Sequence, residues 1–279
     1  MSFEKRSLKI PSSQPGWNLD AWQYLPAAEG AAKPTPIIVM AHGFAADKTM
    51  GLGRYAEVFV AAGYACLVFD YRRWGASDGT PRQVLVVKDQ LEDYRTVIKY
   101  ARQQPEFDPQ RLVLWGSSLS GAHAITLSAE SAVNAVAALA QCPYTGTSAP
   151  LPLCLASLKV AASVVFDIMK QTLGLAPVYI PVVSEPGTVG ALTTEGTRAG
   201  MLAICSDPRY SFVSASSLLQ VPSYQPRAKA GQITCPLLIV LPIRDNLLPC
   251  GHFDMYFGAS HHTESITAQL EFLKKHVPV

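Results

Sequence analysis

A serine-rich turn between an apolar segment and a helical segment is the first place where this sequence could carry out chemistry. Residues 114–121 read LWGSSLSG, with small residues on both sides of Ser118. Small neighbours let the backbone turn so tightly that the side chain between them stands clear, and a following helix points its N–H groups at a reacting atom. Ser118 is therefore the candidate nucleophile. The alternative is a structural turn that only requires small residues.

A serine hydroxyl attacks a carbonyl only when a base takes its proton and a carboxylate orients that base. Asp245 directly follows an apolar segment and His252 precedes the last helical segment, which gives the chain order Ser, Asp, His. The simpler interpretations are a turn or capping aspartate and a surface-loop histidine. Asp254 is a competing carboxylate, but two residues from His252 it is badly placed to reach the imidazole.

The negatively charged oxygen that forms in such an attack requires two preorganised N–H donors. The N–H of Leu119, the residue after the nucleophile, is one candidate. The other is the N–H of Phe44, at the end of the sequence AHGF that closes an earlier apolar segment. We expect His42 to hold this loop in place and His123 to be a packed side chain rather than a base.

Continuous apolar segments alternate with helical segments, which is typical of a parallel sheet covered by helices on both faces. The expected class is therefore α/β, with a doubly wound and mostly parallel sheet. The expected strands are 8–10, 19–24, 37–41, 64–70, 111–116, 133–142 and 235–242, and the expected helices are 55–62, 87–104, 118–129 and 263–276. Asp70, Ser77 and Asp78 are expected to form a polar turn network with a structural role.

The alternation stops between residues 143 and 230, where few residues are charged and a helix is expected over 153–173, ended by Gly174. We expect this segment to be a cap inserted into a core formed by residues 1–142 and 231–279. Open α/β sheets bind ligands at the carboxyl ends of their strands. The cap is therefore expected to cover the site.

Composition excludes several classes of function. A net charge of +2 without a cluster of Lys and Arg disfavours nucleic-acid binding. No apolar segment approaches the roughly 20 residues that cross a bilayer, and the first ten residues, MSFEKRSLKI, lack the apolar stretch of a secretory signal, so a cytoplasmic protein is expected. The six cysteines are scattered without metal-ligand spacing. We expect reduced, mostly buried thiols and neither metal nor cofactor.

Four motifs in this order, AHGF, FDYRRWGASDG, LWGSSLSG and RDNLLP…GHFDMY, together resemble the α/β-hydrolases. The chain is similar in particular to dienelactone hydrolases, to the catalytic domain of X-Pro dipeptidyl peptidases and to fungal polyketide transferases. This resemblance implies a serine-dependent esterase, thioesterase or acyltransferase of secondary metabolism. It would form an acyl-enzyme from a hydrophobic, polyketide-like substrate, free or bound to a carrier.

Other functions remain open at this point. The same scaffold could perform a non-hydrolytic step such as cyclisation, retro-aldol or C–C bond cleavage, or bind a ligand without catalysis. An X-Pro peptidase requires an acidic anchor for a free amine, and the expected cap offers few carboxylates: Asp167, Glu185, Glu195 and Asp207. A homodimer is also left open.

The chain departs from the resemblance in two places. Ser120 stands where the serine motif usually has glycine, and Asp245 and His252 are only seven positions apart. The α/β-hydrolases usually place a helix and a whole strand between these two residues. We therefore expect that a segment is missing between Cys250 and Gly251.

Overall fold

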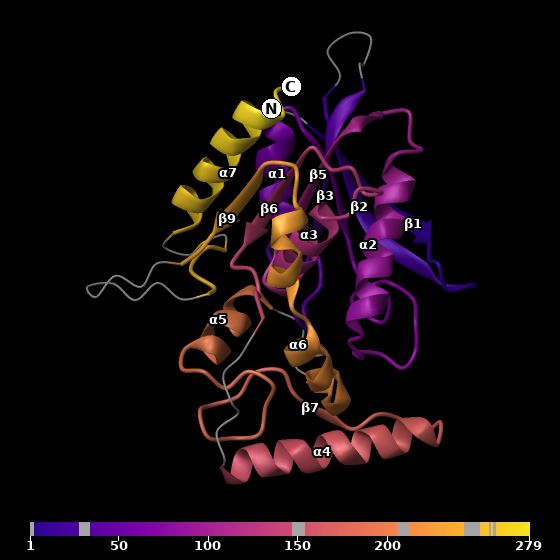
Figure 1. Cartoon of the computed structure of the whole chain (residues 1–279), viewed down its shortest axis with the longest axis vertical. Helices are drawn as coiled ribbons and strands as arrows, with labels where there is room; N and C mark the ends of the chain where they lie inside the picture. Colours follow the sequence, from indigo (N-terminus) through magenta and orange to yellow (C-terminus); the bar gives the residue numbers. More distant parts are fainter. Residues whose placement is uncertain are drawn as a thin grey trace.

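The computed structural model is described for residues 3–27, 34–146, 154–205, 212–242, 252–256, 258 and 261–279. Within them, a seven-stranded sheet has the order β1-β2-β4-β3-β5-β6-β9 (Figure 1). The first two strands are antiparallel to their neighbours, and the other five run parallel. The strands are β1 (Phe3–Pro11), β2 (Asn18–Pro26), β3 (Thr35–Ala41), β4 (Ala65–Phe69), β5 (Phe107–Ser117), β6 (Ala137–Gln141) and β9 (Leu237–Val240).

Helices cover both faces of this sheet. The four helices packed on it are α1 (Leu52–Ala61), α2 (Val87–Ala101), α3 (Leu119–Ser128) and α7 (His262–His276). Side chains of α2 and α3 belong to one buried apolar cluster, and side chains of α1 and α7 belong to another. The expected class, an α/β fold with a mostly parallel sheet between two helical layers, is confirmed.

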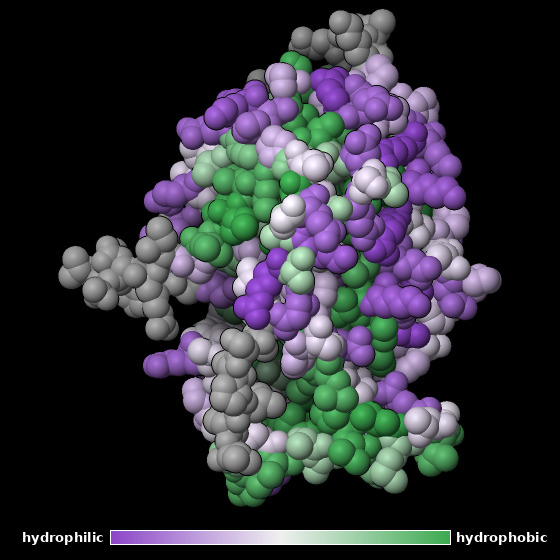
Figure 2. All heavy atoms as spheres, in the orientation of Figure 1, coloured by the Kyte–Doolittle hydropathy of each residue, from purple (hydrophilic) through white to green (hydrophobic). Residues whose placement is uncertain are grey.

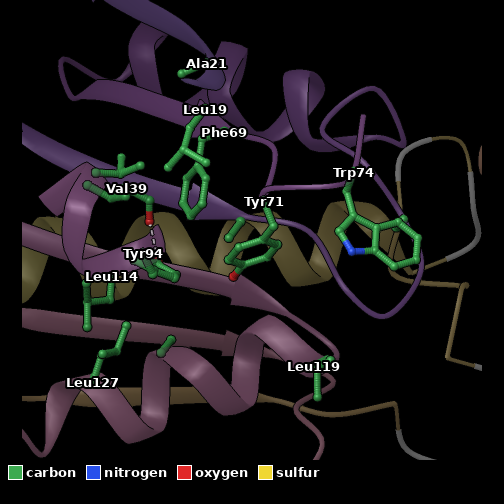
Figure 3. Close-up of a cluster of buried hydrophobic side chains, with 14 of the residues drawn as sticks. Leu19, Ala21, Val39, Phe69, Tyr71, Trp74, Tyr94, Leu114, Leu119 and Leu127 are labelled. Atoms are coloured by element: carbon green, nitrogen blue, oxygen red, sulfur yellow. Dashed lines mark hydrogen bonds between the residues drawn. The ribbon is translucent and has the colours of Figure 1, made fainter. Parts of the chain in front are cut away.

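Side chains along each central strand alternate between these two clusters. In β3, Ile37 and Val39 face the α2–α3 side, whereas Ile38 and Met40 face the α1–α7 side. Because both faces are covered, the whole strand is apolar, which is why it reads as a continuous apolar run. Figure 3 shows the first cluster, where the Tyr94 hydroxyl donates a hydrogen bond to the Val39 carbonyl at 2.7 Å and so joins α2 to the sheet.

Most of the segment between β6 and β9, including α4 and α5, lies at the end of the molecule opposite the C-terminus, and its last part returns to pack against α3 (Figure 1). Its described elements are α4 (Leu155–Thr172), β7 (Tyr179–Pro181), α5 (Thr197–Ile204), β8 (Phe212–Ser214), the 3₁₀ helices η2 (Ala215–Leu219) and η3 (Pro226–Gln232), and α6 (Gln220–Ser223). The expected helix over 153–173 corresponds to α4. Within the described part of the chain, no helix combines the length and the apolar character needed to cross a bilayer.

The structure corrects two details of the sequence interpretation. β1 and β2 are longer than the short strands expected at 8–10 and 19–24, because they pair with each other along nine residues. Only Cys66 and Cys142 are buried among the five described cysteines, and Cys154 is exposed. The expectation of mostly buried thiols was therefore wrong.

Candidate active site

Ser118 occupies a strained turn between β5 and α3. Its φ of 57° and ψ of −117° lie in a region that L-residues rarely adopt. The turn is held from both sides, because the Ser118 N–H donates to the Gln141 carbonyl at 2.8 Å and a Cβ added to Gly116 would stand 1.9 Å from the Ser120 carbonyl oxygen. Such strain persists only where the surroundings impose it, and it is concentrated at functional sites.

Ser120, the residue that replaces the usual glycine, ties this turn to the neighbouring loop. Its fully buried hydroxyl donates a hydrogen bond to the His42 carbonyl and lies 2.6 Å from the Tyr71 hydroxyl. The departure from the motif is thus compensated by two polar partners. Sequence reasoning treated this serine only as a tolerable small residue, since its partners lie far away in the chain.

The loop after β3 approaches the turn closely at Gly43. A Cβ on Gly43 would lie 2.9 Å from the Ser118 Cβ, and the buried His42 ring donates from Nδ1 to the Gly43 carbonyl at 3.0 Å. Burial lowers the pKa of His42, so its ring is neutral at neutral pH. Phe44 and Ser118 thus line one cavity, Leu119 directly follows Ser118 at the start of α3, and His42 contacts the loop. That the N–H groups of Phe44 and Leu119 bind an oxyanion stays a prediction.

Replacing Gly43 by alanine is expected to lower kcat/KM by about 10²–10³-fold, because the new methyl group must push the loop or Ser118 aside. Displacing one N–H donor from a developing oxyanion has an effect of this size. Steady-state kinetics on an activated ester measure it. Gly231→Ala is the matched control, since an added Cβ there meets no atom within 4 Å, and equal losses in both variants would contradict the role of Gly43.

A cavity of about 180 Å³ opens above Ser118. Four segments contribute to its wall: the loop after β3, the turn at Ser118, the segment around α5, and the loop before α7. The lining residues are Gly43, Phe44, Ala46, Ser118, Leu192, Thr194, Thr197, Met201, Ile204, His252, Phe253 and Tyr256. His252 and Ser118 thus share one cavity, although 134 positions separate them in the sequence.

His252 is half-buried beside the ring of Phe253, with the ring centroids 5.2 Å apart. Burial lowers its pKa, which keeps the imidazole neutral and able to accept a proton at neutral pH. Asp245 lies outside the described residues. Among the described residues, no group of three or more His, Cys, Asp and Glu side chains is arranged to hold a metal ion.

Two tyrosines anchor the loop that carries His252. The Tyr256 hydroxyl lies 2.6 Å from the Ser117 hydroxyl, directly beside the candidate nucleophile, and the Tyr55 hydroxyl donates to the Met255 carbonyl. In this way α1 and the end of β5 fix the loop from two directions. Sequence reasoning missed both residues, although the tyrosine in GHFDMY offered a signal, since a buried tyrosine hydroxyl usually needs a partner.

The polar residues after β4 form the expected structural network. Asp70 accepts hydrogen bonds from the backbone N–H groups of Lys48 and Ala76, at 2.7 and 2.9 Å. The Ser77 hydroxyl donates to the Asp70 carbonyl at 2.6 Å, and Asp78 accepts the Asn18 N–H at 2.8 Å. None of these side chains lines the cavity.

His123 is packed in the core, as expected, with one ring nitrogen 3.0 Å from the Tyr224 hydroxyl and the other 3.0 Å from Gln90 Oε1. Burial lowers its pKa to about 3. In the unfolded chain this pKa returns to about 6.5. Between about pH 6.5 and 3 the unfolded chain therefore binds a proton that the folded protein does not bind. The free energy of unfolding falls as the pH drops through this range.

For this reason the free energy of unfolding is expected to be about 3 kcal/mol smaller at pH 4 than at pH 8 from His123 alone. Urea denaturation across this pH range measures it. His123→Gln removes the titrating ring and is expected to flatten the profile by that amount. An unchanged slope in this variant would contradict the assignment.

An X-Pro peptidase would need a carboxylate in the cavity to bind the free amine of its substrate. No Asp or Glu is among the described residues that line the cavity. Asp167 is fully buried and accepts the backbone N–H groups of Val178 and Ser216, at 2.7 and 2.8 Å. Glu185 is exposed, and its Oε1 lies 3.6 Å from Nη1 of Arg198. Asp207 lies outside the described residues. An acidic anchor for a free amine is therefore absent from the described lining.

Comparison with known proteins agrees with this architecture. The family model described as serine aminopeptidase, S33, matches residues 32–192. The quorum-quenching protein AidA of Acinetobacter baumannii (strain MDR-ZJ06) is 36% identical over 93% of this chain and 91% of its own length. The polyketide transferase grgF of Penicillium sp. is 27% identical over 94% of each chain.

A solved structure of DcsB in complex with its substrate analogue has the same fold. It superposes with a TM-score of 0.80 at 20% identity and covers 99% of this chain and 100% of its own. The expected similarity to α/β-hydrolases and fungal polyketide transferases is thus confirmed. Since the family model matches more than half of the 279 residues and a relative is more than 30% identical over nearly the whole chain, the protein belongs to the serine aminopeptidase S33 family of α/β-hydrolases.

Proposed function

We propose that this protein is a serine hydrolase or acyltransferase that transfers a hydrophobic acyl group through an acyl-enzyme at Ser118. The observation that carries the proposal is the shared cavity: a serine held at a strained, positive φ faces the same 180 Å³ space as a half-buried histidine. A strained serine with a histidine across one cavity is the arrangement that nucleophilic attack on a carbonyl requires.

Each residue has a role in this mechanism. His252 takes the proton of the Ser118 hydroxyl as it attacks and later gives it to the leaving group. Asp245 orients the imidazole and stabilises its charged form. The N–H groups of Leu119 and Phe44 donate to the oxyanion, and α3 adds the positive end of its dipole. The acyl-enzyme is then released to water in hydrolysis, or to an alcohol or amine in transfer.

The cavity points to a hydrophobic acyl group. Leu192, Met201 and Ile204 are among its lining residues, together with Thr194 and Thr197. Apolar side chains with a few polar groups are typical of a site for a small hydrophobic ligand. Relatives named thiohydrolases, such as aneE of Aspergillus aculeatus, make a thioester, free or bound to a carrier, the substrate to test first.

We further propose that residues 143–230 act as a cap on the core formed by 1–142 and 231–279. The support is contact between α5 and the loop that carries His252, because a Cβ on Gly200 would lie 2.4 Å from the Phe253 ring. α5 also supplies Met201 and Ile204 to the cavity. Any acyl group that enters must therefore pass between this segment and the core.

A fluorophosphonate tests the nucleophile directly. Intact-protein mass spectrometry is expected to show one covalent adduct on the wild type and none on Ser118→Ala. A panel of p-nitrophenyl esters and acyl thioesters of increasing length then tests the substrate, and kcat/KM is expected to be higher for hydrophobic acyl groups than for charged ones, because apolar side chains line the cavity. A folded wild-type protein that takes up no label would refute the proposal.

Within the proposal, transfer to an organic acceptor is favoured by the similarity to grgF, whose name denotes a polyketide transferase; the second candidate is a non-hydrolytic reaction such as cyclisation, retro-aldol or C–C bond cleavage. The Ser118–His252 pair would then move protons or deliver the acyl group to an organic acceptor rather than to water. Product analysis in the presence of added alcohols and amines distinguishes the outcomes. A trapped acyl-enzyme that reacts with them faster than with water supports transfer, whereas reaction without any acyl-enzyme supports cyclisation or C–C cleavage.

A further inference from the structure

Helix α4 turns an apolar stripe toward solvent. Its outward residues recur every three or four positions, and all the large ones among them are exposed by 55% to 73%. We call this surface the α4 stripe; it consists of Leu155, Leu158, Ala162, Val165, Met169 and Leu173. Figure 2 shows hydrophobic residues gathered along the end of the molecule that α4 occupies in Figure 1. Apolar surface of this extent on a soluble protein usually marks an interaction site.

The opposite face of α4 is firmly attached to the protein. Val164 and Asp167 are its two buried residues, and Asp167 accepts backbone N–H groups from both Val178 and Ser216. Because a buried carboxylate with two donors cannot rotate outward without losing both bonds, the helix is fixed in its orientation. The stripe is therefore a true outer surface of the folded chain.

We propose that the α4 stripe is a homodimer interface in which two copies of α4 pack antiparallel across a two-fold axis. The spacing supports a helix as the partner: positions 155, 158, 162, 165 and 169 follow the alternating three- and four-residue steps of a heptad repeat. Such a repeat packs against another helix through knobs and holes. Ala162, near the middle of the stripe, lets the two helices approach closely.

The area of the surface agrees with a dimer of standard size. Burying one large apolar side chain removes roughly 60–120 Å² of apolar surface from water, as its transfer free energy of about 1.5–3 kcal/mol implies. The stripe, with its exposed neighbours Phe166 and Ile168, therefore offers on the order of 400 Å² per copy. A standard interface buries about 800 Å² per partner, of which somewhat more than half is apolar. The exposed apolar area matches that fraction.

The basic residues of α4 lie beside the stripe and leave the seam itself uncharged. They are Lys159 and Lys170, and both lie along the same edge of the stripe. In antiparallel packing these edges face each other, and Lys159 of each copy lies beside Phe166 of the other, where a cation–π contact offsets the repulsion between the lysines. Segments that bind anionic lipid carry clusters of roughly four to eight basic residues. Two lysines on α4 are fewer than that, which favours a helix partner over a lipid surface.

Light scattering coupled to size exclusion tests the interface on the full chain. The wild type is expected to be a dimer at micromolar concentration, and Val165→Glu is expected to raise the dissociation constant at least 30-fold, because it places two carboxylates in the apolar seam. Leu202→Glu is the matched control: Leu202 is 52% exposed on α5, outside the stripe, and this variant is expected to remain dimeric. A monomeric wild type, or a Val165→Glu variant as dimeric as the control, would overturn the proposal.

Disulfide trapping reports the direction of the helices. In a Cys154→Ser background, a mixture of Leu158→Cys and Met169→Cys proteins is expected to form the mixed disulfide on oxidation, since antiparallel packing places these two positions opposite each other. Preferred Leu158→Cys homodimers would indicate parallel packing and contradict the model. In flotation with phosphatidylserine vesicles the protein is expected to stay unbound. If the wild type were monomeric and bound the vesicles, and Val165→Glu abolished this binding, the stripe would be assigned to a membrane instead.

Discussion

Ser118→Ala is expected to lower kcat/KM at least 10⁴-fold while the protein stays folded. The loss is this large because no other described group in the cavity offers a hydroxyl at a strained turn beside the candidate oxyanion donors. The activity that remains over water would come from binding and the oxyanion donors alone. The measurement is kcat/KM on the best ester or thioester, together with the urea unfolding midpoint of the same preparation.

Neighbouring serines provide the matched controls for this result. Ser117→Ala removes the partner of the Tyr256 hydroxyl, and Ser120→Gly removes the bonds to His42 and Tyr71. Both variants are expected to keep the nucleophile and to take up a fluorophosphonate, with rates reduced by no more than about 100-fold, the cost of a slightly displaced site. Labelling that persists in Ser118→Ala, or that disappears in Ser117→Ala instead, would assign the nucleophile to another serine.

The central part of the fold could be predicted because its pattern is local. β3, β4 and β5 are covered on both faces, so each is a continuous apolar run, and the helices between them are amphipathic. The lengths of β1 and β2 could not be predicted in this way. β1 is exposed over almost its whole length, and β2 alternates half-buried and buried residues only from Asn18 to Gln23, so the ends of both strands are set by pairing with each other rather than by their own residues.

The strained turn at Ser118 and the loop after β3 that approaches it could also be predicted from local motifs. What the sequence did not reveal is how they are held together. The Ser120 hydroxyl meets Tyr71, 49 positions away, and the Ser117 hydroxyl meets Tyr256, 139 positions away. No periodicity or spacing encodes such pairs, because each depends on the packing of the complete sheet.

The sequence departs most from the α/β-hydrolase pattern in the short stretch between Asp245 and His252. Among the described residues between β9 and α7, none forms a strand. The alignments with AidA and grgF span 286 and 289 positions, more than the 279 residues of this chain, so each alignment contains gaps in this chain. We propose that a main gap lies between Cys250 and Gly251. Tyr55 and Tyr256 then explain how the loop reaches the cavity, since they fix it from α1 and β5.

Asp70→Ala is expected to destabilise the protein by about 3–5 kcal/mol, the usual cost of leaving a buried charge without its partner. Lys48 is almost fully buried, and its Nζ lies 2.5 Å from both Asp70 Oδ2 and Asp20 Oδ1. Burial alone would lower the pKa of Lys48, but the two carboxylates outweigh it and raise that pKa, so the lysine stays charged. Removing Asp70 leaves this cation with one partly exposed carboxylate and also frees the Ala76 N–H.

A double variant shows whether the buried charge is the cause. Lys48→Met combined with Asp70→Ala is expected to regain at least half of the lost unfolding free energy, because no unpaired charge remains in the core. Glu130→Gln, which breaks the more exposed pair with Arg95, is expected to cost no more than about 1 kcal/mol. If the double variant were as unstable as Asp70→Ala alone, the loss would come from the backbone hydrogen bonds of Asp70.

Asp70 Oδ1 also lies 4.0 Å from Nε2 of His42, in the loop that presents Phe44. The single variant Asp70→Ala is therefore expected to weaken this loop and to lower both activity and stability.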